Sequence, residues 1–157
     1  MNILKISSSI YSVDGQSSQL ASQFVRALRE REPGGRVTER DLARETLPHL
    51  DAARFQAFLA KPEERTAEQR AIAGDSDALI QELRDADVLV LGLPMYNFGV
   101  PSQLKSYFDH IARAGVTFKY TAKGAVGLLG GRKAYVFAAR GGLDQGPPRP
   151  TQWPYRR

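Results

Sequence analysis

Apolar residues along the chain form two kinds of pattern, short continuous runs and longer stretches with helical spacing. The run from Asn2 to Ser7 is short and β-type, and a serine cluster follows it. Leu20, Phe24 and Leu28 then recur at helical spacing until a Pro-Gly-Gly stretch ends the pattern. The run that follows Asp87 is continuously apolar, as expected of a strand buried on both faces of a parallel sheet. The chain therefore begins as strand, polar loop and helix, and forms a buried strand near its middle.

The other predicted elements continue this alternation of strands and helices. A weaker strand is predicted at 36–41, where it suits a sheet edge, and a second buried strand at 133–139. Helices are predicted at 51–60, from Thr66 onward and from Pro101 onward. Thr66 and Gln69 have the spacing of a capping box, which marks a helix start. The glycine-punctuated stretch over 115–131 is interpreted as a connection. The pattern predicts a doubly wound parallel α/β sheet of four strands.

Composition limits the chain to one ordinary domain. Its 157 residues are 42% apolar and 25% charged, and none is cysteine. The lack of cysteine excludes disulfides, cysteine-ligated metals and a thiol nucleophile. No apolar run approaches the ~20 residues of a membrane helix, and the first residues reach serines too early for a signal-peptide core. We therefore expect a cytoplasmic protein without membrane contact.

The net charge of +5 does not indicate nucleic-acid binding. Residues 140–157 hold four arginines and one aspartate, so most of the excess lies near the end of the chain. Before them, acids and bases are interleaved. Nucleic-acid binding needs a basic patch on an ordered face, and we expect none.

The last residues depart from the alternation. Gly-Pro-Pro-Arg-Pro at 146–150 cannot form a helix, because proline lacks the amide donor. A sheet of this kind normally adds a further helix and strand after such a buried strand. We expect one domain over 1–145 and a disordered Pro/Arg-rich tail over 146–157. The ending is interpreted as truncated or out of frame; a naturally short chain is the alternative.

Three loops follow predicted strands and meet at the ligand-binding edge of such a sheet. The first, residues 7–18, is rich in serine and leads into a helix N-terminus. Backbone amides, the hydroxyls of Ser9, Ser17 and Ser18 and the positive helix end suit a phosphate, and Gly15 lets the chain turn. The alternative is an ordinary helix cap with polar loop residues.

The second and third loops suit a flat ring. Met95, Tyr96 and Phe98 place flat apolar side chains at a strand end, with Asn97 able to donate and accept hydrogen bonds; the alternative is packing under the next helix. The third loop is Arg140-Gly141-Gly142, where paired glycines allow close backbone approach; the alternative is a plain turn. A phosphate cradle, a ring platform and a glycine edge together suggest flavin mononucleotide (FMN).

With these residues the sequence resembles the FMN-dependent NADH-azoreductases, a branch of the flavodoxin-like quinone reductases. The likeness runs from about residue 2 to residue 142. It rests on the segments 16–20, PMYNF at 94–98, 103–109, RAGVTFKYT at 113–121 and 140–142. The resemblance implies a flavodoxin-like fold, one FMN per subunit and a homodimer. It also implies hydride transfer from NADH to a quinone or azo compound with ping-pong kinetics.

The same resemblance implies a role for each matching residue. Those assigned to the FMN phosphate are Ser9, Gln16 and Ser17; those under the ring are Met95, Tyr96, Asn97 and Phe98; those at its pyrimidine edge are Gly141 and Gly142. Phe118 and Tyr120 would shape the substrate pocket across the dimer interface. Gly15 and Ala139 depart from the family, which often has hydroxyl residues there, although the backbone contacts of Ala139 and Arg140 could survive.

No side chain is expected to act as a catalyst, because the chemistry belongs to the flavin. His49 is predicted at the surface and His110 half-buried or solvated on its helix; two distant histidines without clustered carboxylates make no metal site. Two alternatives stay open. One is an FMN-binding electron carrier of flavodoxin type, and the other is a fragment with impaired activity.

Overall fold

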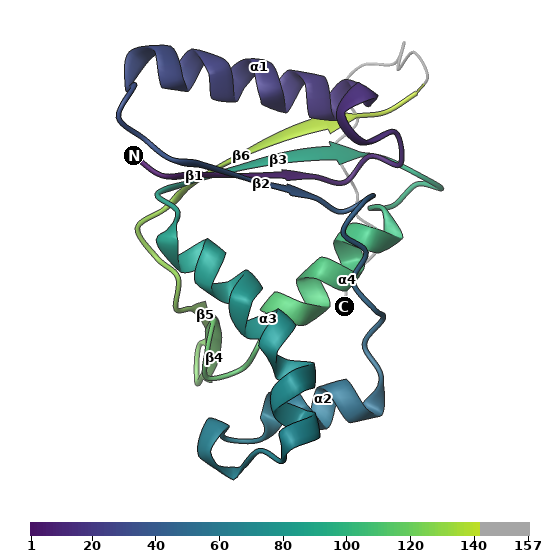
Figure 1. Ribbon diagram of the computed structural model, residues 1–157, viewed down its shortest axis with the longest axis vertical. Coiled ribbons are helices and arrows are strands. Elements are labelled where there is room, and N and C mark those ends of the chain that lie inside the picture. Colours follow the sequence, from purple (N-terminus) through teal and green to yellow (C-terminus); the bar gives the residue numbers. More distant parts are fainter. Residues whose placement is uncertain (142–157) are drawn as a thin grey trace.

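A four-stranded parallel sheet forms the middle of the computed structural model, which describes residues 1–141 (Figure 1). Its strands follow the order β2-β1-β3-β6. Their bounds are Ile3–Ser7 for β1, Val37–Asp41 for β2, Val88–Pro94 for β3 and Lys133–Ala139 for β6. Ile3 lies opposite both Val37 and Val88, so β1 is central and β2 forms an edge. The predicted parallel α/β sheet, with its weak strand at an edge, is confirmed.

Helices cover both faces of the sheet (Figure 1). Helix α1 (Gln16–Arg31) lies along one face, and α3 (Ala67–Asp85) and α4 (Ser102–Ile111) lie on the opposite face. Helix α2 (Ala52–Leu59) packs against α3, farther from the sheet. Two short 3-10 helices are η1 (Ser12–Asp14) and η2 (Pro62–Glu64). Within residues 1–141, no helix is both long and apolar enough to cross a membrane.

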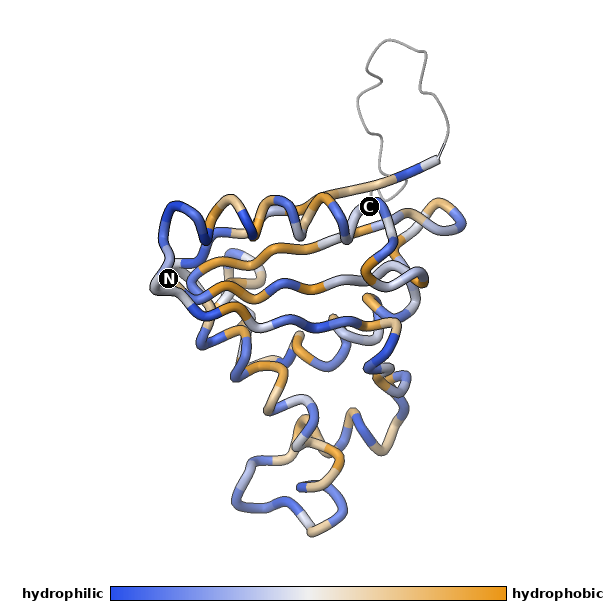
Figure 2. The backbone as a smooth tube through the Cα atoms, turned by 45° about the horizontal axis from the view of Figure 1, so that its top comes forward, coloured by the Kyte–Doolittle hydropathy of each residue, from blue (hydrophilic) through white to orange (hydrophobic). Residues whose placement is uncertain are grey.

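Apolar side chains fill both interfaces between sheet and helices. Figure 2 shows hydrophobic residues along the inner strands of the sheet, whereas the edge strand β2 is mostly hydrophilic. The cluster beneath α1 contains Ile3, Ala21, Val25, Val88 and Val90. The cluster beneath α3 and α4 includes Leu4, Ile6, Leu79, Leu83, Leu104 and Tyr107. Ile3 and Leu4 are neighbours in β1 that serve opposite clusters, because side chains alternate along a strand.

The start of α3 is fixed by the predicted capping box. The backbone N–H of Gln69 donates to Thr66 Oγ1 over 3.1 Å, and the backbone N–H of Thr66 donates to Gln69 Oε1 over 3.0 Å. Two first-turn donors are therefore satisfied reciprocally. This prediction from the sequence is confirmed.

The strand predicted at 133–139 forms as β6, but the prediction that it is buried is wrong for most of its residues. Val136 is 57% exposed and Tyr135 is 36% exposed. Phe24 of α1 packs its ring against Tyr135 and Phe137, at centroid distances of 4.6 and 5.2 Å. Within residues 1–141 no element covers the opposite face of this strand or pairs with its outer edge. The apolar run thus forms a strand, but one face of that strand remains at the surface.

The interpretation of 115–131 as a connection is also wrong in part. Strands β4 (Phe118–Thr121) and β5 (Gly124–Gly127) form an antiparallel hairpin within it. Phe118 and Tyr120 alternate with Lys119 and Thr121 along β4, which is the period of a strand, but each strand has only four residues and is mostly exposed. Gly124 has a φ of +110°, which a glycine adopts without steric cost.

One close approach fixes α1 on the sheet. Gly92 in β3 faces the first turn of α1, and a Cβ atom there would lie 3.0 Å from the carbonyl oxygen of Ser17. The carbonyl of Gly92 accepts hydrogen bonds from the backbone N–H and the hydroxyl of Ser8, over 3.2 and 2.8 Å. Gly92 therefore holds both the helix start and the loop that leads to it.

We expect Gly92→Ala to lower the free energy of unfolding by about 1–3 kcal/mol, because the added methyl group forces α1 away from β3. Gly74→Ala is the matched control, since Gly74 lies in α3 with open space around its Cα. It should raise stability by about 0.5–1 kcal/mol through helix propensity. Urea unfolding of both variants measures the effect. A Gly92→Ala protein as stable as the wild type would contradict the packing described.

A buried phenol lies beneath the sheet. Tyr107 is 1% exposed, and its hydroxyl has no hydrogen-bond partner within residues 1–141. Burial, with a contribution from the charge of Glu82, raises the pKa of Tyr107 well above its usual value, while Arg40 acts in the opposite direction. An unfolded tyrosine loses its proton near pH ~10. The folded state is therefore penalised as the pH rises past that value.

We expect Tyr107→Phe to change stability at pH ~7 by less than about 1 kcal/mol, because the deleted hydroxyl makes no hydrogen bond. Between pH ~9 and ~11 the wild type should lose about 1.4 kcal/mol of unfolding free energy that the variant keeps. Urea unfolding across this pH range compares the two proteins. Parallel pH profiles would show that the phenol is not protected from ionisation.

Candidate functional site

The loops after β1, β3 and β6 line one pocket at the carboxyl edge of the sheet. Its volume is about 730 Å³. Parallel strands end at the same edge, which explains why segments distant in sequence meet there. Nine predicted site residues line it: Ser9, Gly15, Gln16, Ser17, Met95, Tyr96, Ala139, Arg140 and Gly141.

One end of the pocket is a neutral anion cradle. Helix α1 begins after Gly15, and no side chain within residues 1–141 caps its first turn. The first-turn N–H groups therefore keep their donor capacity, with the positive end of the helix dipole. Ser17 is 1% exposed, and its hydroxyl has no partner in the described part of the chain. An unpartnered buried hydroxyl beside free amides is suited to a phosphate.

Gly15 gives the serine loop its shape by leaving space. A Cβ atom at this position would lie 2.1 Å from Ser9 Oγ and 2.5 Å from Ser9 Cβ. The φ of Gly15 is −66°, an ordinary value for any residue, so close packing rather than backbone strain accounts for the glycine. Ser9 is 1% exposed as a result.

Hydrogen bonds join the three loops to one another. The phenol oxygen of Tyr96 accepts from the backbone N–H of Ile10 over 3.2 Å and lies 3.4 Å from Ser9 Oγ. The backbone N–H of Met95 donates to the carbonyl of Ala139 over 2.8 Å. The first loop is thus connected to the second, and the second to the third.

Two residues of the second loop do not line the pocket. Asn97 and Phe98 have φ values of 49° and 61°, unusual for residues with side chains. Tyr96 and Gly99 exchange backbone hydrogen bonds of 3.1 and 3.0 Å around them, which closes a tight turn. Phe98 is 94% exposed. The alternative interpretation, in which this loop packs under the next helix, is therefore wrong for Phe98.

The structure places Phe118 and Tyr120 apart from the pocket of their own chain. Both lie on β4, on the side of the sheet that carries α3 and α4 (Figure 1). Their rings meet edge to face with centroids 5.3 Å apart, and Tyr120 is 77% exposed. Gly142 and the tail predicted over 146–157 lie outside the described residues.

The histidines differ from each other. His49 is exposed, as predicted, and its Nδ1 lies 3.1 Å from Ser106 Oγ. The prediction for His110 is wrong, because it is 0% exposed. The ring of Phe58, on α2, packs edge-on against it, and no sequence pattern indicates that α2 covers this part of α4. Among residues 1–141, no group of three or more potential ligands could hold a metal ion.

Sequence reasoning missed some residues of the pocket. Tyr11 and Leu20 line it, whereas Ser18 does not. Leu20 belongs to the helical apolar pattern in the sequence, yet it is 44% exposed. Its position near the start of α1, shortly after the serine loop, is the signal that could have identified it.

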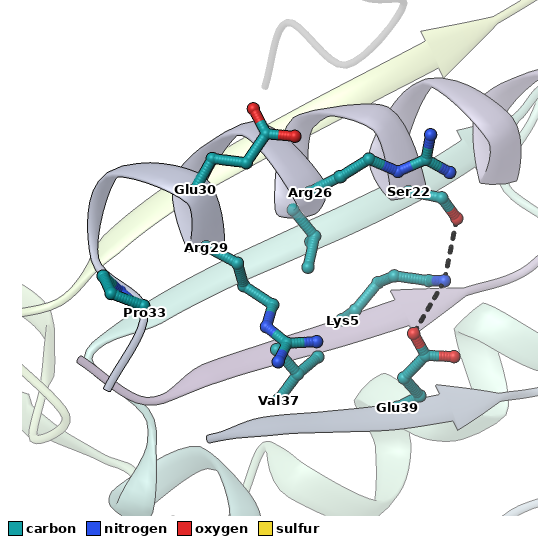
Figure 3. Close-up of a pocket in the computed structure, with 9 residues that line it drawn as sticks. Lys5, Ser22, Arg26, Arg29, Glu30, Pro33, Val37 and Glu39 are labelled. Carbon is teal, nitrogen blue, oxygen red and sulfur yellow. Dashed lines mark hydrogen bonds and ion pairs between the residues drawn. The ribbon is translucent and has the colours of Figure 1, made fainter. Parts of the chain in front are cut away.

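A second pocket of about 620 Å³ lies between α1 and β2 (Figure 3). Lys5 points into it but is already held, with Nζ 2.8 Å from Ser22 Oγ and 3.2 Å from Glu39 Oε1. Arg26 and Glu30 on its rim carry opposite charges. Because the buried charge is satisfied and the rim is mixed, this pocket is not the stronger candidate for an anionic ligand.

Comparison with known proteins identifies the family of this chain. Residues 1–155 match the family described as "Flavodoxin-like fold". The chain is 54% identical over 153 residues to an FMN-dependent NADH:quinone oxidoreductase of Cellvibrio japonicus. It is 55% identical over the same length to one of Burkholderia thailandensis. Each alignment covers 98% of this chain and 77% of the relative.

Solved structures show the same similarity. An azoreductase from Bacillus anthracis has a TM-score of 0.82 at 30% identity, over 94% of this chain and 73% of that one. An FMN-dependent NADH-azoreductase from the same species, in complex with FMN, has a TM-score of 0.79 at 29% identity. That match covers 91% of this chain and 70% of the other.

Proposed function

This chain belongs to the flavodoxin-like family of FMN-dependent NADH:quinone oxidoreductases, and we propose on that basis that it uses FMN to pass hydride from NADH to a quinone or an azo compound. The observation that carries the proposal is the meeting of the three loops in one pocket. A neutral anion cradle lies at one end of it and apolar side chains lie beside it.

The phosphate end of FMN fits the serine loop. Ser9, Gln16 and Ser17 line the pocket at the start of α1, and the Ser17 hydroxyl lacks a partner among the described residues. Hydrogen bonds to a charged acceptor are stronger than neutral ones. One phosphate oxygen would satisfy this hydroxyl, and the first-turn amides would hold the others.

The ring end of FMN fits the second and third loops. Met95 and Tyr96 form its wall. Asn97 and Phe98 lie at the tip of the same turn, outside the pocket of this chain, and their contact with the ring is assigned from the sequence alone. Gly141 and Gly142 would approach the pyrimidine edge, and Ala139 and Arg140 would contribute their backbones; Gly142 is assigned from the sequence alone. Each subunit would hold one FMN.

FMN, when bound, supplies the hydride chemistry. The chain orients the ring, and the backbone N–H of Gly141 would donate a hydrogen bond where negative charge develops on reduction. No side chain of the pocket need act as a nucleophile or metal ligand. Because one pocket would serve both substrates in turn, oxidised nicotinamide leaves before the acceptor enters, which gives ping-pong kinetics.

A second subunit would complete the substrate pocket. Phe118 and Tyr120 are presented on an outward hairpin and do not line the pocket of their own chain. In a homodimer they would cover the ring of the neighbouring subunit with an aromatic surface suited to flat quinones and azo compounds. NADH is an intracellular coenzyme, so the proposed reaction belongs in the cytoplasm.

A one-electron carrier of flavodoxin type is the competing function. It would bind the same cofactor at the same edge, so the pocket alone does not separate the two. The relatives named as NADH:quinone oxidoreductases favour the enzyme. Direct hydride transfer from NADH discriminates between them, because a one-electron carrier needs a protein partner instead.

We expect the purified protein, incubated with FMN and passed through a desalting column, to retain yellow flavin absorbance. Anaerobic NADH should bleach that absorbance, and a quinone added afterwards should restore it. Initial rates with both substrates varied should give parallel double-reciprocal lines. A protein that retains no flavin would overturn the proposal. Retained flavin that NADH does not bleach would favour the electron carrier.

We expect Ser17→Ala to weaken FMN binding about 10- to 100-fold, because it removes a hydrogen bond to a charged phosphate. Ser18→Ala is the matched control, since Ser18 is also buried and its hydroxyl has no partner among residues 1–141, but it does not line the pocket. Its affinity should stay within about twofold of the wild type. Fluorescence titration of FMN measures both, and equal affinities would contradict the assignment of Ser17.

A further inference from the structure

Two buried arginines share one carboxylate away from the cofactor pocket. Arg113 donates through Nη1 to Asp77 Oδ1 and, over 3.1 Å, to Ser76 Oγ. Arg65 donates through its own Nη1 to Asp77 Oδ2 over 3.0 Å. Both arginines are 6% exposed, and Ser76 Oγ donates in turn to the carbonyl of His110 over 2.6 Å. The cluster joins α3 to the end of α4.

Arg113 extends this cluster into the base of the β4–β5 hairpin. Its backbone N–H donates to Thr117 Oγ1 over 3.0 Å, and its carbonyl accepts from the backbone N–H of Thr117 over 2.9 Å. Thr117 Oγ1 donates to the carbonyl of Ile111 over 2.6 Å. The carbonyl of Thr117 accepts from the backbone N–H of Leu128 over 2.8 Å, which closes the hairpin. Phe118 follows directly.

The hairpin itself has little to hold it in place. Its strands are mostly exposed, and an isolated two-stranded hairpin is marginally stable in water. The fixed point is the base, where the Arg113 guanidinium also lies 5.3 Å from the ring centre of Phe58. The orientation of the Phe118–Tyr120 pair therefore depends on the buried contacts of Arg113 and Thr117.

We propose that Arg113 and Thr117 are positioning residues that set how Phe118 and Tyr120 meet the substrate in the pocket of a second subunit. The inference rests on the proposed function. The RAGVTF segment then acts as the fixed base of the hairpin, which we call the joint. Arg113 anchors it to α3, Thr117 holds its turn by hydrogen bonds, and the aromatic pair follows on β4.

Arg65 provides a matched control for Arg113. It shares the same carboxylate at the same degree of burial. Its other contacts are local to the α2–α3 connection, where Nε donates to the carbonyl of Ala60 over 3.3 Å and its carbonyl accepts from Arg70. It makes no hydrogen bond to the hairpin in the described part of the chain.

The test compares Arg113→Met with Arg65→Met in the FMN-loaded protein. Both variants should lower the urea midpoint, because each removes a buried partner of Asp77. Only Arg113→Met should raise the KM for a quinone, by about tenfold, while FMN affinity stays within about twofold of the wild type. Arg113→Lys should recover part of that loss, because it keeps a positive charge for Asp77 but loses the planar guanidinium, whose Nη1 reaches both Asp77 and Ser76.

Amide hydrogen exchange gives a readout independent of activity. In Arg113→Met and in Thr117→Val, the amides of Gly115 and Leu128 should exchange at least about tenfold faster than in Arg65→Met. Thr117→Val removes only a hydroxyl, so it carries the test if Arg113→Met does not fold. Equal exchange and equal KM values in the arginine pair, or a Thr117→Val protein identical to the wild type, would overturn the inference.

Different results would overturn the proposed function and the positioning role. A wild-type protein that retains no FMN would overturn the proposed function, while the exchange comparison would still report on the joint. A wild type that reduces quinones, with both arginine variants equally affected, would overturn only the positioning role.

Discussion

The structure depends on the contact between the first turn of α1 and strand β3. Gly92 allows it, since any side chain would meet the carbonyl of Ser17. The same glycine carbonyl accepts two hydrogen bonds from Ser8. One position in a central strand thus fixes the strand, the loop after β1 and the helix that follows. The free amides of α1 and the Ser17 hydroxyl reach the carboxyl edge of the sheet because the helix can lie this close.

The rest of the site follows from that placement. The loop after β1 meets Tyr96 of the second loop, and Met95 is bonded to Ala139 at the end of β6. Each loop is therefore held by at least one of the other two. Such preorganisation lowers the cost of ordering the pocket when a ligand binds. It also explains why a pocket built from loops can still hold a planar ring in a defined orientation.

Much of this architecture could be predicted from the sequence, where local patterns and burial agree. The capping box at Thr66 and the weak edge strand β2 are examples. The family was recognisable because PMYNF and RAGVTF combine unusual residue types in order. The apolar run at 133–139 predicted the strand β6 but not its exposure, since such a run indicates what a strand can bury and not which element covers it. Burial of His110 depends on α2, whose position is a tertiary property.

The fold uses neutral donors at the cofactor pocket and buried charges at the base of the hairpin. At its phosphate end the cofactor pocket offers a helix terminus, hydroxyls and backbone amides, all of them neutral donors. They can bind a dianion, yet they leave no unpaired charge when the site is empty. The hairpin base instead buries two arginines against the half-exposed Asp77. Buried ion pairs contribute little net stability but strongly disfavour alternative arrangements, because separating them leaves an unpaired charge. Neutral donors thus suit the part that must bind and release, and fixed charges suit the part that must keep one orientation.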